Sequence, residues 1–373
     1  MKLFIIAGTR PEAIKLVPVY IESKKRGIEV KLISTGQHRE MLDQVFKWFE
    51  IEPDNDLEIM QKNQTLVTLT SNALLKLDTL FTEEKPDWVM VQGDTTTAFV
   101  ASLAAYYHKI KVAHVEAGLR THNKYSPWPE EINRSLIGRI ADLHFAPTAL
   151  SAENLKRENI EEDMIFITGN TVIDALLYTN DKAKNENIYP VNLQHFFIGD
   201  QNNKKLVLIT GHRRENWGQG FEEICKAIKT LAIRYPEIHF VYPVHLNPNV
   251  QEPVQRLLSG HHNIILTDPL NYPEFVRMMD RSYIILSDSG GVQEEAPSLG
   301  KPVLVMRDTT ERPEGVEAGS VKLVGTSSVS IINSFIELME DDSLYQKMSN
   351  VKNPYGDGTA SRKIIDILIK NNC

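Results

Sequence analysis

The residues best suited to anion chemistry form the run Ser-Asp-Ser-Gly-Gly-Val-Gln-Glu-Glu at residues 287–295. This run follows an apolar segment typical of a buried strand and precedes a segment typical of a helix. Glycine at such a junction lets backbone N–H groups approach an anion, and a helix N-terminus favours negative charge. We therefore expect Ser289, Gly290 and Gly291 to bind phosphate or diphosphate. The alternative is a tight turn in which the glycines serve only backbone geometry.

Two arginines occupy matching positions, in Gly-Thr-Arg ending at Arg10 and in Gly-His-Arg ending at Arg213. Each follows an apolar run, and a guanidinium group binds phosphate oxygens in pairs. The sequence therefore predicts that at least one of the two contacts a diphosphate; either alone would also fit a solvated surface arginine. His212, between the second glycine and arginine, is a candidate acid or phosphate partner, or a structural histidine.

Carboxylates also follow apolar runs in the first half of the chain, at Asp94 and Glu116, and the pair Glu130 and Glu131 opens a predicted helix after Pro-Trp-Pro. Converging acids would suit general acid–base work, because neighbouring like charges separate their pKa values. Simpler roles remain open: Asp94 as a helix N-cap, Glu116 as an ion-pair partner of Arg120, and the glutamate pair as favourable charges in a first helical turn. Adjacent helical residues point about 100° apart, so at most one of the pair faces such a site.

Apolar runs with strand character alternate with segments of helical period. The strand candidates are residues 3–7, 30–34, 88–92, 111–115 and 165–168, then 206–210, 239–243, 264–267, 283–287 and 302–306. The helix candidates include residues 11–25, 95–107, 130–141, 221–234 and 274–280. This alternation predicts an α/β fold with two doubly wound parallel sheets. Ligands of such sheets bind beyond the carboxyl ends of the strands, so we expect a cleft between the two domains.

A chain of 373 residues exceeds the size of a usual single core, which favours two domains. Residues 182–205 are polar, rich in asparagine and without clear period, and are the best linker candidate. We expect an N-terminal domain over residues 1–182 and a C-terminal domain over residues 183–358. A helix over residues 359–373 is expected to pack back on the first domain.

Composition narrows the class of protein. Lysine and arginine total 41 against 49 acidic residues, a formal net charge of −8, which disfavours a broad nucleic-acid surface. Two cysteines suggest neither a disulfide framework nor a zinc cluster. The apolar N-terminus is too short for a signal peptide, and no stretch approaches the ~18 apolar residues of a membrane span. We expect a soluble, cytoplasmic protein.

Motifs for common cofactors are missing. The sequence has no Gly-x-Gly-x-x-Gly at a strand–helix turn and no Walker A motif, so neither NAD nor ATP binding is indicated. The Asp-Asn-Asp at residues 54–56 is typical of an acidic turn rather than a metal site. The histidines have no metal-ligand spacing with nearby cysteines or acids.

A series of long, ordered motifs resembles the non-hydrolysing UDP-N-acetylglucosamine 2-epimerases over nearly the whole chain. The motifs are Gly-Thr-Arg-Pro-Glu-Ala from residue 8, Gln-Gly-Asp-Thr-Thr-Thr from 92, His-Val-Glu-Ala-Gly-Leu-Arg-Thr from 114, Pro-Trp-Pro-Glu-Glu from 127, Gly-Asn-Thr-Val-Ile-Asp from 169, Gly-His-Arg-Arg-Glu-Asn from 211, the run at 287–295, and Arg-Asp-Thr-Thr-Glu-Arg-Pro-Glu from 307.

The resemblance implies a glycosyltransferase-B-like fold, with two Rossmann-like domains facing a central cleft. It implies reversible inversion at C2 of UDP-N-acetylglucosamine, giving UDP-N-acetylmannosamine by elimination of UDP and its re-addition to 2-acetamidoglucal. Neither NAD nor an obligatory metal is implied. The family further implies a homodimer whose product supplies cell-surface polysaccharide such as teichoic acid or capsule.

The resemblance also assigns residues. Asp94, Glu116 and Glu130 are implied as catalytic carboxylates, and His212 as the residue that stabilises the leaving diphosphate. The implied contacts to the UDP-sugar also include Arg10, Lys15, Leu270, Phe275, Ser289, Gly290, Gly291, Glu295 and Arg312. Within this set, Glu295 would accept the ribose hydroxyls and Phe275 would pack beside uracil.

Some bacterial members bind a second UDP-N-acetylglucosamine that regulates the reaction. Gln37 and His38 resemble part of that site, with Arg213 and His245 as partners. This sequence departs at Asn63, where regulated members carry an arginine, so the coupling is expected to be weaker or absent. The alternative for Gln37 and His38 is an ordinary polar turn that caps the next helix.

Other functions share this fold. A glycosyltransferase would also bind a UDP-sugar but commonly needs one base, whereas reversible elimination needs several acids near one sugar. A non-catalytic sensor would need the binding residues without the three acids. A hydrolysing relative would release free N-acetylmannosamine. The three acids therefore favour the epimerase.

Overall fold

The computed structural model describes residues 1–36, 39–59, 64–198 and 204–372. Within these residues the strands form two sheets, one of seven and one of six strands, and all strand pairs are parallel. The chain divides into two compact units, unit 1 with Met1–Ala175 and Tyr355–Cys373 and unit 2 with Leu176–Pro354. The predicted α/β class with two doubly wound sheets is confirmed.

The sheet of unit 1 has the strand order β3-β2-β1-β4-β5-β6-β7. Its strands are β1 Lys2–Ala7, β2 Glu29–Ser34, β3 Asn55–Asp56, β4 Trp88–Gln92, β5 Lys111–Val115, β6 Leu143–Ala146 and β7 Ile165–Ile167. The central strands β1 and β4 are almost wholly buried. Burial on both faces explains why they are continuous apolar runs rather than alternating ones.

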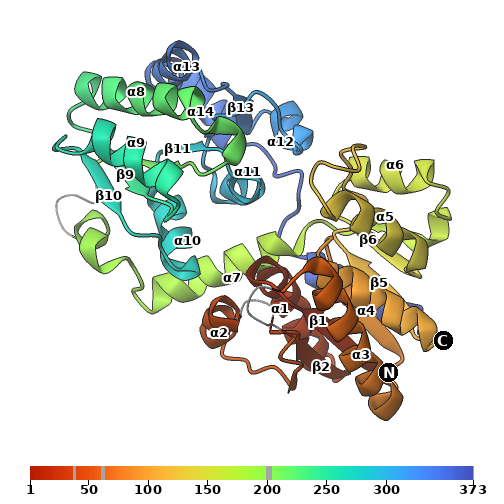
Figure 1. Cartoon of the computed structure of the whole chain (residues 1–373). Helices are drawn as coiled ribbons and strands as arrows, with labels where there is room; N and C mark the ends of the chain where they lie inside the picture. Colours follow the sequence, from red (N-terminus) through yellow and green to blue (C-terminus); the bar gives the residue numbers. More distant parts are fainter. Residues whose placement is uncertain (37–38, 60–63, 199–203, 373) are drawn as a thin grey trace. The chain divides into compact units, whose positions relative to one another are not determined.

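Helices cover the sheet of unit 1 (Figure 1). They are α1 Arg10–Lys25, α2 Arg39–Trp48, α3 Leu66–Glu84, α4 Thr96–Tyr107, α5 Glu130–Ile140, α6 Ala149–Arg157 and α15 Ala360–Lys370. Helix α1 packs against α2 and α15, whereas α3, α4 and α5 pack in succession. Because crossovers between parallel strands are right-handed, the reversal of strand order after β3 places these two groups on opposite faces.

The last segment of the chain belongs to unit 1. Asp174 in helix α7 (Thr171–Asn185) accepts hydrogen bonds from the backbone N of Ala360 (3.2 Å) and Ser361 (2.8 Å). It thereby satisfies N–H groups at the start of α15, which the helix cannot satisfy itself. Burial raises the pKa of Asp174, although these hydrogen bonds act to lower it. At the other end, Trp88 Nε1 donates to Asn372 Oδ1 (3.1 Å).

The sheet of unit 2 has the strand order β10-β9-β8-β11-β12-β13. Its strands are β8 Leu206–Thr210, β9 His239–Pro243, β10 Ile264–Thr267, β11 Ile284–Ser287, β12 Val303–Val305 and β13 Val321–Leu323. Its helices are α8 Gln219–Arg234, α9 Pro248–Leu258, α10 Tyr272–Arg281, α11 Gly290–Glu295, α12 Pro313–Ala318, α13 Ser328–Glu340 and α14 Asp342–Ser349.

The segment expected as a linker, residues 182–205, contains regular structure. It begins with the last turn of α7 and includes a 3₁₀ helix at Val191–Phe196. Leu193 and Phe196 of this short helix are fully buried, so their burial outweighs the polar composition around them. The division into compact units falls after Ala175, inside α7.

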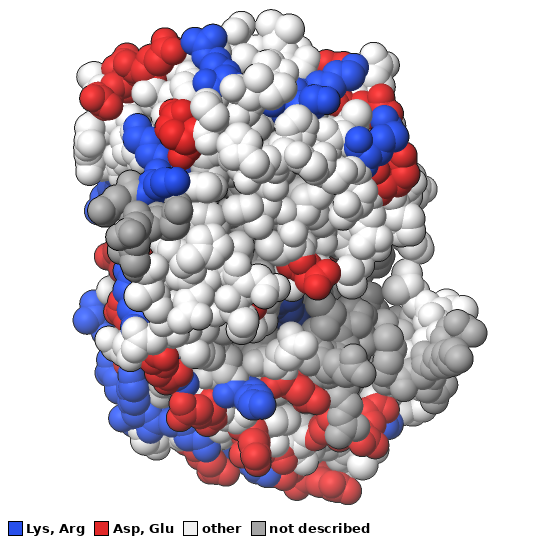
Figure 2. Space-filling model, turned by 90° about the vertical axis from the view of Figure 1, so that its left-hand side faces the viewer, with Lys and Arg blue, Asp and Glu red and all other residues white. Residues whose placement is uncertain are grey.

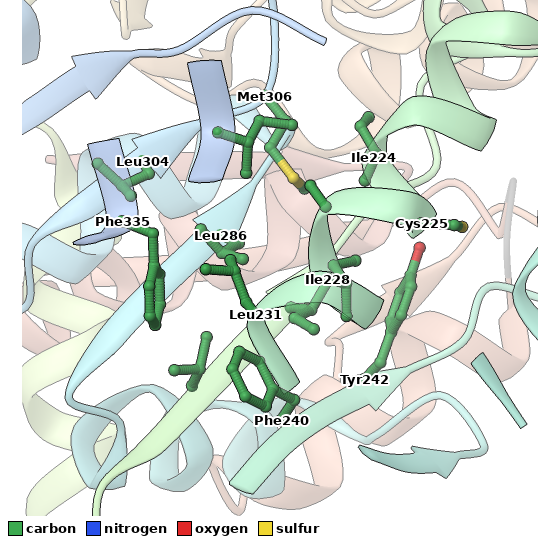
Figure 3. Close-up of a cluster of buried hydrophobic side chains, with 14 of the residues drawn as sticks. Ile224, Cys225, Ile228, Leu231, Phe240, Tyr242, Leu286, Leu304, Met306 and Phe335 are labelled. Atoms are coloured by element: carbon green, nitrogen blue, oxygen red, sulfur yellow. The ribbon is translucent and has the colours of Figure 1, made fainter. Parts of the chain in front are cut away.

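The core of unit 2 shows why its main helix forms. The buried residues of α8 recur every three or four positions, which places them on one face of the helix. Figure 3 shows this face, with Ile224, Ile228 and Leu231, packed over side chains of the sheet that include Phe240 and Leu286. Cys225 lies in the same cluster, and burial raises the pKa of its thiol to about 12. The thiol therefore packs as a small apolar group.

The surface carries both charges. Figure 2 shows lysine and arginine side chains interspersed with aspartate and glutamate over the visible face, without a broad basic patch. None of the helices in the described ranges is long and apolar enough to cross a membrane.

Two histidines are buried side by side in unit 1. His114 on β5 is opposite His144 on β6, and both are at most 1% exposed. His114 Nε2 donates to the carbonyl oxygen of Gly93 (2.7 Å). Burial lowers the pKa of His114 to about 3 and that of His144 to about 4, so both are neutral in the folded protein at pH 7.

Acid should therefore destabilise this protein before its carboxylates titrate. An unfolded histidine takes up a proton near pH 6.5, whereas these two stay neutral when folded. The unfolded state then binds more protons, so the free energy of unfolding falls as pH drops from about 6.5 to 5, by up to about 1.4 kcal/mol per pH unit for each histidine. Urea unfolding across this range should show the slope, and His144→Asn should reduce it. An unchanged slope in this variant would contradict the assignment.

Candidate active site

Each sheet reverses its strand order beside its first strand. Strand β1 lies between β2 and β4 in unit 1, and β8 lies between β9 and β11 in unit 2. Ligands of doubly wound sheets bind beyond the carboxyl ends of the strands at such a switch point. Arg10 follows β1 and Asp94 follows β4, while His212 follows β8 and Ser289 follows β11. The structure thus places these four candidates at the two switch points.

The loop after β1 is held by Glu12, which is 1% exposed. Its Oε2 accepts hydrogen bonds from the backbone N of Gly8 (3.0 Å) and Thr9 (2.7 Å), and its Oε1 accepts one from Thr95 Oγ1 (2.6 Å). Burial raises the pKa of Glu12, and these hydrogen bonds act against that rise. A Cβ on Gly8 would lie within 2.6 Å of two threonine hydroxyls, so glycine is required there. Arg10 therefore begins α1 from a fixed loop.

Glu116 is a buried carboxylate surrounded by donors. Lys15 Nζ lies 2.7 Å from each of its oxygens, and Asn170 Nδ2 donates to Oε1 (3.1 Å). Gln92 Nε2 donates to Oε2. The backbone of Glu116 is in the left-handed region, with φ of 61°. A residue other than glycine adopts this conformation at a cost of roughly 1–3 kcal/mol, and such strain is common at functional sites.

One structural alternative for Glu116 is wrong. Arg120 pairs with Glu158 rather than with Glu116, through two hydrogen bonds of 2.6 and 2.7 Å. Burial acts to raise the pKa of Glu158, but Arg120 holds that pKa below its ordinary value. The structure therefore gives Glu116 a lysine partner that comes from a helix 101 residues earlier in the chain.

The alternative for Asp94 as a helix cap is also wrong. Thr95 is the N-cap of α4, because its hydroxyl accepts a hydrogen bond from the backbone N of Ala98 (3.0 Å). The Asp94 carboxylate instead pairs with the guanidinium of Arg134. Asn133 Nδ2 donates to the carbonyl oxygen of Asp94 (2.9 Å), which ties α5 to the loop after β4.

Glu130 and Glu131 differ in their hydrogen-bond partners. Glu131 is 4% exposed and accepts hydrogen bonds from the backbone N of Thr121 (3.1 Å) and His122 (2.8 Å), with Arg134 Nη1 at 3.2 Å. Glu130 is half-buried, and among the described residues its carboxylate has no hydrogen-bond or ion-pair partner. Glu131 thus fixes the loop before α5, and Glu130 is available for chemistry.

Two of the three candidate acids follow neighbouring strands, and the third lies on the helix that contacts one of them. Asp94 and Glu116 follow the neighbouring strands β4 and β5, which are paired along their length. Glu130 lies one turn before Arg134 and so shares its helix face, and Arg134 contacts Asp94. Unit 1 therefore carries a cluster of carboxylates in which Asp94 and Glu116 have cationic partners.

In unit 2, a fully buried acid holds the loop after β8. Asp288 Oδ2 accepts hydrogen bonds from the backbone N of His212 (2.8 Å) and Arg213 (2.9 Å) and from Asn216 Nδ2 (3.3 Å). The His212 ring stacks on His245, with centroids 5.4 Å apart and planes 14° apart. Burial lowers the pKa of His212, Asp288 opposes this change, and His245 adds to it.

Of the two glycines after β11, Gly290 is the closely packed one. Helix α11 begins at Gly290, and the backbone N of Ser289 donates to Ser287 Oγ (3.0 Å). A Cβ on Gly290 would lie 3.0 Å from Glu311 Oε1, so a side chain there would press on that carboxylate. Gly291 is exposed. The phosphate-binding role expected for these residues stays a prediction.

Three arginines of unit 2 pair with two glutamates. Arg213 Nη2 lies 3.2 Å from Glu311 Oε1, and Arg307 Nη1 lies 2.7 Å from Glu311 Oε2. Burial acts to raise the pKa of Glu311, but Arg312 and Arg307 lower it to about 2. Arg312 itself pairs with Glu294, which is 2% exposed. These pairs hold the guanidinium groups in fixed positions.

The other expected nucleotide contacts lie near the same edge of this sheet. Glu295, in α11, is 8% exposed. Phe275 lies in the first turn of α10 and Leu270 in the loop before it, and both are half-buried.

Only some of the residues expected at the regulatory site lie in the described part of the chain. Gln37 and His38 lie outside the described residues, as does Asn63. His245 is exposed in the loop after β9. The regulatory site stays a prediction.

Glu12, Asp288, Gln92, Arg134 and Asn170 belong to these networks but were not selected from the sequence as site residues. Two of them had a local signal. Thr9-x-x-Glu12 with Pro11 has the pattern of a capping box, and the structure forms it. Asp288 lies directly after a strand in the glycine run, where an acid at a strand end is a recognisable candidate. The others, which depend on partners distant in the chain, are Gln92, Arg134 and Asn170.

No group of three or more histidines, cysteines and acids in the described part of the chain is arranged to hold a metal ion.

Comparison with known proteins covers the whole chain. Residues 21–369 match the family model of UDP-N-acetylglucosamine 2-epimerase. The UDP-N-acetylglucosamine 2-epimerase of Campylobacter jejuni is 55% identical over 375 residues, covering 99% of this chain and 97% of that protein.

Solved structures agree. The crystal structure of UDP-GlcNAc 2-epimerase from Neisseria meningitidis bound to UDP-GlcNAc matches with a TM-score of 0.90 and 54% identity, covering 100% of both chains. The Methanocaldococcus jannaschii UDP-GlcNAc 2-epimerase in complex with UDP-GlcNAc and UDP matches with a TM-score of 0.81 and 35% identity, again covering 100% of both. The glycosyltransferase-B-like architecture and the resemblance seen in the sequence are confirmed, and the chain belongs to the UDP-N-acetylglucosamine 2-epimerase family.

Proposed function

We propose that this protein interconverts UDP-N-acetylglucosamine and UDP-N-acetylmannosamine by inverting C2 of the sugar. Full-length relatives that carry the name UDP-N-acetylglucosamine 2-epimerase support this activity. The observation that carries the chemical proposal is that Asp94 and Glu116 follow neighbouring strands of unit 1, while Glu130 lies on the helix whose Arg134 contacts Asp94. A transferase commonly needs one base, whereas inversion needs proton transfer on both faces of one sugar.

The chemistry of the substrate sets what these acids must do. No carbonyl lies next to C2, so its proton is not acidic. We propose that UDP leaves from C1 with its bonding electrons while a base removes the C2 proton, which gives 2-acetamidoglucal. A proton then adds to C2 from the opposite face, and UDP returns to C1. Because hydrogen leaves and returns as a proton, the proposed reaction involves no net oxidation or reduction of the sugar, and none of its steps requires NAD.

The proposed roles of the acids follow from their partners. Lys15 lies 2.7 Å from both oxygens of Glu116, and electrostatic attraction favours a charged carboxylate there. A charged Glu116 would stabilise positive charge on the sugar as UDP departs. Asp94 is positioned by Arg134, and Glu130 is without such a partner among the described residues. We propose Asp94 and Glu130 as the groups that exchange protons with C2.

The proposed nucleotide contacts belong mainly to unit 2. The Ser289 hydroxyl and the backbone N–H groups of Gly290 and Gly291 would bind the diphosphate. Arg10 would also contact phosphate oxygens. His212 would stabilise negative charge on the leaving UDP. Glu295, Phe275, Leu270 and Arg312 complete the proposed nucleotide contacts.

We further propose that the product supplies cell-surface polysaccharide synthesis and that the protein acts in the cytoplasm as a homodimer. These assignments rest on the family relationship.

The activity can be tested by NMR in heavy water. UDP-N-acetylglucosamine incubated with the protein should yield UDP-N-acetylmannosamine, with deuterium at C2 of the sugar. Free N-acetylmannosamine would instead indicate a hydrolysing enzyme, and product without deuterium at C2 would contradict proton exchange with solvent.

The two adjacent glutamates provide a matched comparison. We expect Glu130→Gln to lower turnover by roughly 10²–10⁴-fold without changing the melting temperature, because it removes a proton-transfer group that holds no backbone. Glu131→Gln should lower the melting temperature, because it weakens a charged acceptor of two backbone N–H groups. Steady-state kinetics and thermal unfolding of both variants check this. Near-wild-type turnover of Glu130→Gln would overturn its role.

The nucleotide contacts can be tested without the sugar. Arg10→Ala and Ser289→Ala should each weaken UDP binding by about 1.5–3 kcal/mol, the usual contribution of a hydrogen bond to a charged group. Isothermal titration calorimetry with UDP measures this, with Lys229→Ala on the exposed face of α8 as the control. Unchanged affinity in both variants would place the diphosphate elsewhere.

A further inference from the structure

The loop after β8 is braced from two sides. Asp288 Oδ2 accepts the backbone N–H groups of His212 and Arg213. From β9, the buried hydroxyl of Tyr242 donates to the carbonyl oxygen of Gly211 (2.9 Å). Asp288 follows β11, which pairs with β8 so that Ser287 is opposite Thr210. The backbone of the loop is therefore fixed against the edge of the sheet before any ligand is present.

The second oxygen of Asp288 has a different environment. Oδ1 is buried, and no described residue donates a hydrogen bond to it. His212 Nδ1 lies 3.5 Å from this oxygen. A buried carboxylate oxygen without a donor loses its hydrogen bonds to water without replacement, which costs free energy. A small rotation of the imidazole ring would bring an Nδ1 proton within hydrogen-bond distance and remove this cost.

We propose that Asp288 is a positioning residue for His212: its Oδ1 accepts the Nδ1 proton and leaves Nε2 as the nitrogen that meets the diphosphate. The inference rests on the proposed function, in which His212 stabilises the departing UDP. When His212 is neutral, Nδ1 carries the proton and Nε2 can accept one. When His212 is protonated, Nε2 donates to the leaving group while Nδ1 remains bonded to Asp288.

Asp288 also affects the pKa of His212. Burial lowers the pKa of His212, and His245, stacked on its ring, and Arg213, the next residue, lower it further. Asp288 is the group that raises it. The carboxylate therefore favours the imidazolium form that a leaving diphosphate needs nearby.

The variant Asp288→Asn separates positioning from loop support. Three donors face the Oδ2 position, so the amide oxygen must occupy it and the amide NH₂ group faces His212 Nδ1. An NH₂ group donates and cannot accept the Nδ1 proton. We therefore expect neutral His212 to carry its proton on Nε2, the pKa of His212 to fall further, and kcat to fall roughly 10²–10⁴-fold.

The readout is ¹⁵N NMR of histidine-labelled protein over a pH titration, which reports both the pKa and the protonated nitrogen. Asn216→Ala is the matched control, because it removes one donor to Asp288 but keeps the carboxylate. We expect this control to retain the Nδ1 proton and the wild-type pKa of His212. If Asp288 only supported the loop, the two variants would give the same His212 spectra, which would overturn the proposal.

The wild-type protein alone also tests the inference, so a variant that fails to fold does not remove the test. Neutral wild-type His212 with its proton on Nε2 would contradict the proposal. This measurement needs no substrate. Absence of epimerase activity in the wild-type protein would contradict the proposed function, and the NMR result would still decide whether Asp288 positions His212.

Discussion

The carboxylate of one buried acid in each unit accepts the backbone N–H groups of the loop that follows the first strand. In unit 1 Glu12 holds Gly8 and Thr9, and in unit 2 Asp288 holds His212 and Arg213. The backbone N–H groups just after a buried strand lose their hydrogen bonds to water when the chain folds. If no other acceptor were present, these hydrogen bonds would not be replaced. Because these loops lie at the switch points of the sheets, the same acids fix where the candidate arginines and histidine begin.

The candidate carboxylates of unit 1 differ in the groups that they contact. Glu116 faces Lys15 and Asp94 faces Arg134, while Glu131 is occupied by backbone N–H groups. Each of these contacts fixes the position of an acid. Glu130 has no such contact within the described residues, so no partner in this part of the chain fixes the position of its carboxylate.

Local patterns in the sequence predicted much of this arrangement. Apolar runs predicted ten of the strands but not β3, β6 and β13, and acids and glycines after the predicted strands supplied candidate residues. The choice between Arg120 and Lys15 as the partner of Glu116 could not be predicted, because it depends on which side chains tertiary packing brings together. Asn170 reaches the same carboxylate from 54 residues away. The capping pattern of Thr9 and Glu12 was local and was recognisable from the sequence.

Because the C-terminal segment packs on unit 1, this unit cannot complete its folding until the end of the chain has been synthesised. Helix α15 packs against α1, and Asp174 caps it, yet the whole of unit 2 is synthesised between these partners. During translation, the face of α1 that α15 covers stays open to water until residues 360–370 emerge from the ribosome. Unit 2 is continuous in sequence and can complete its core first, whereas unit 1 begins folding earlier and finishes later.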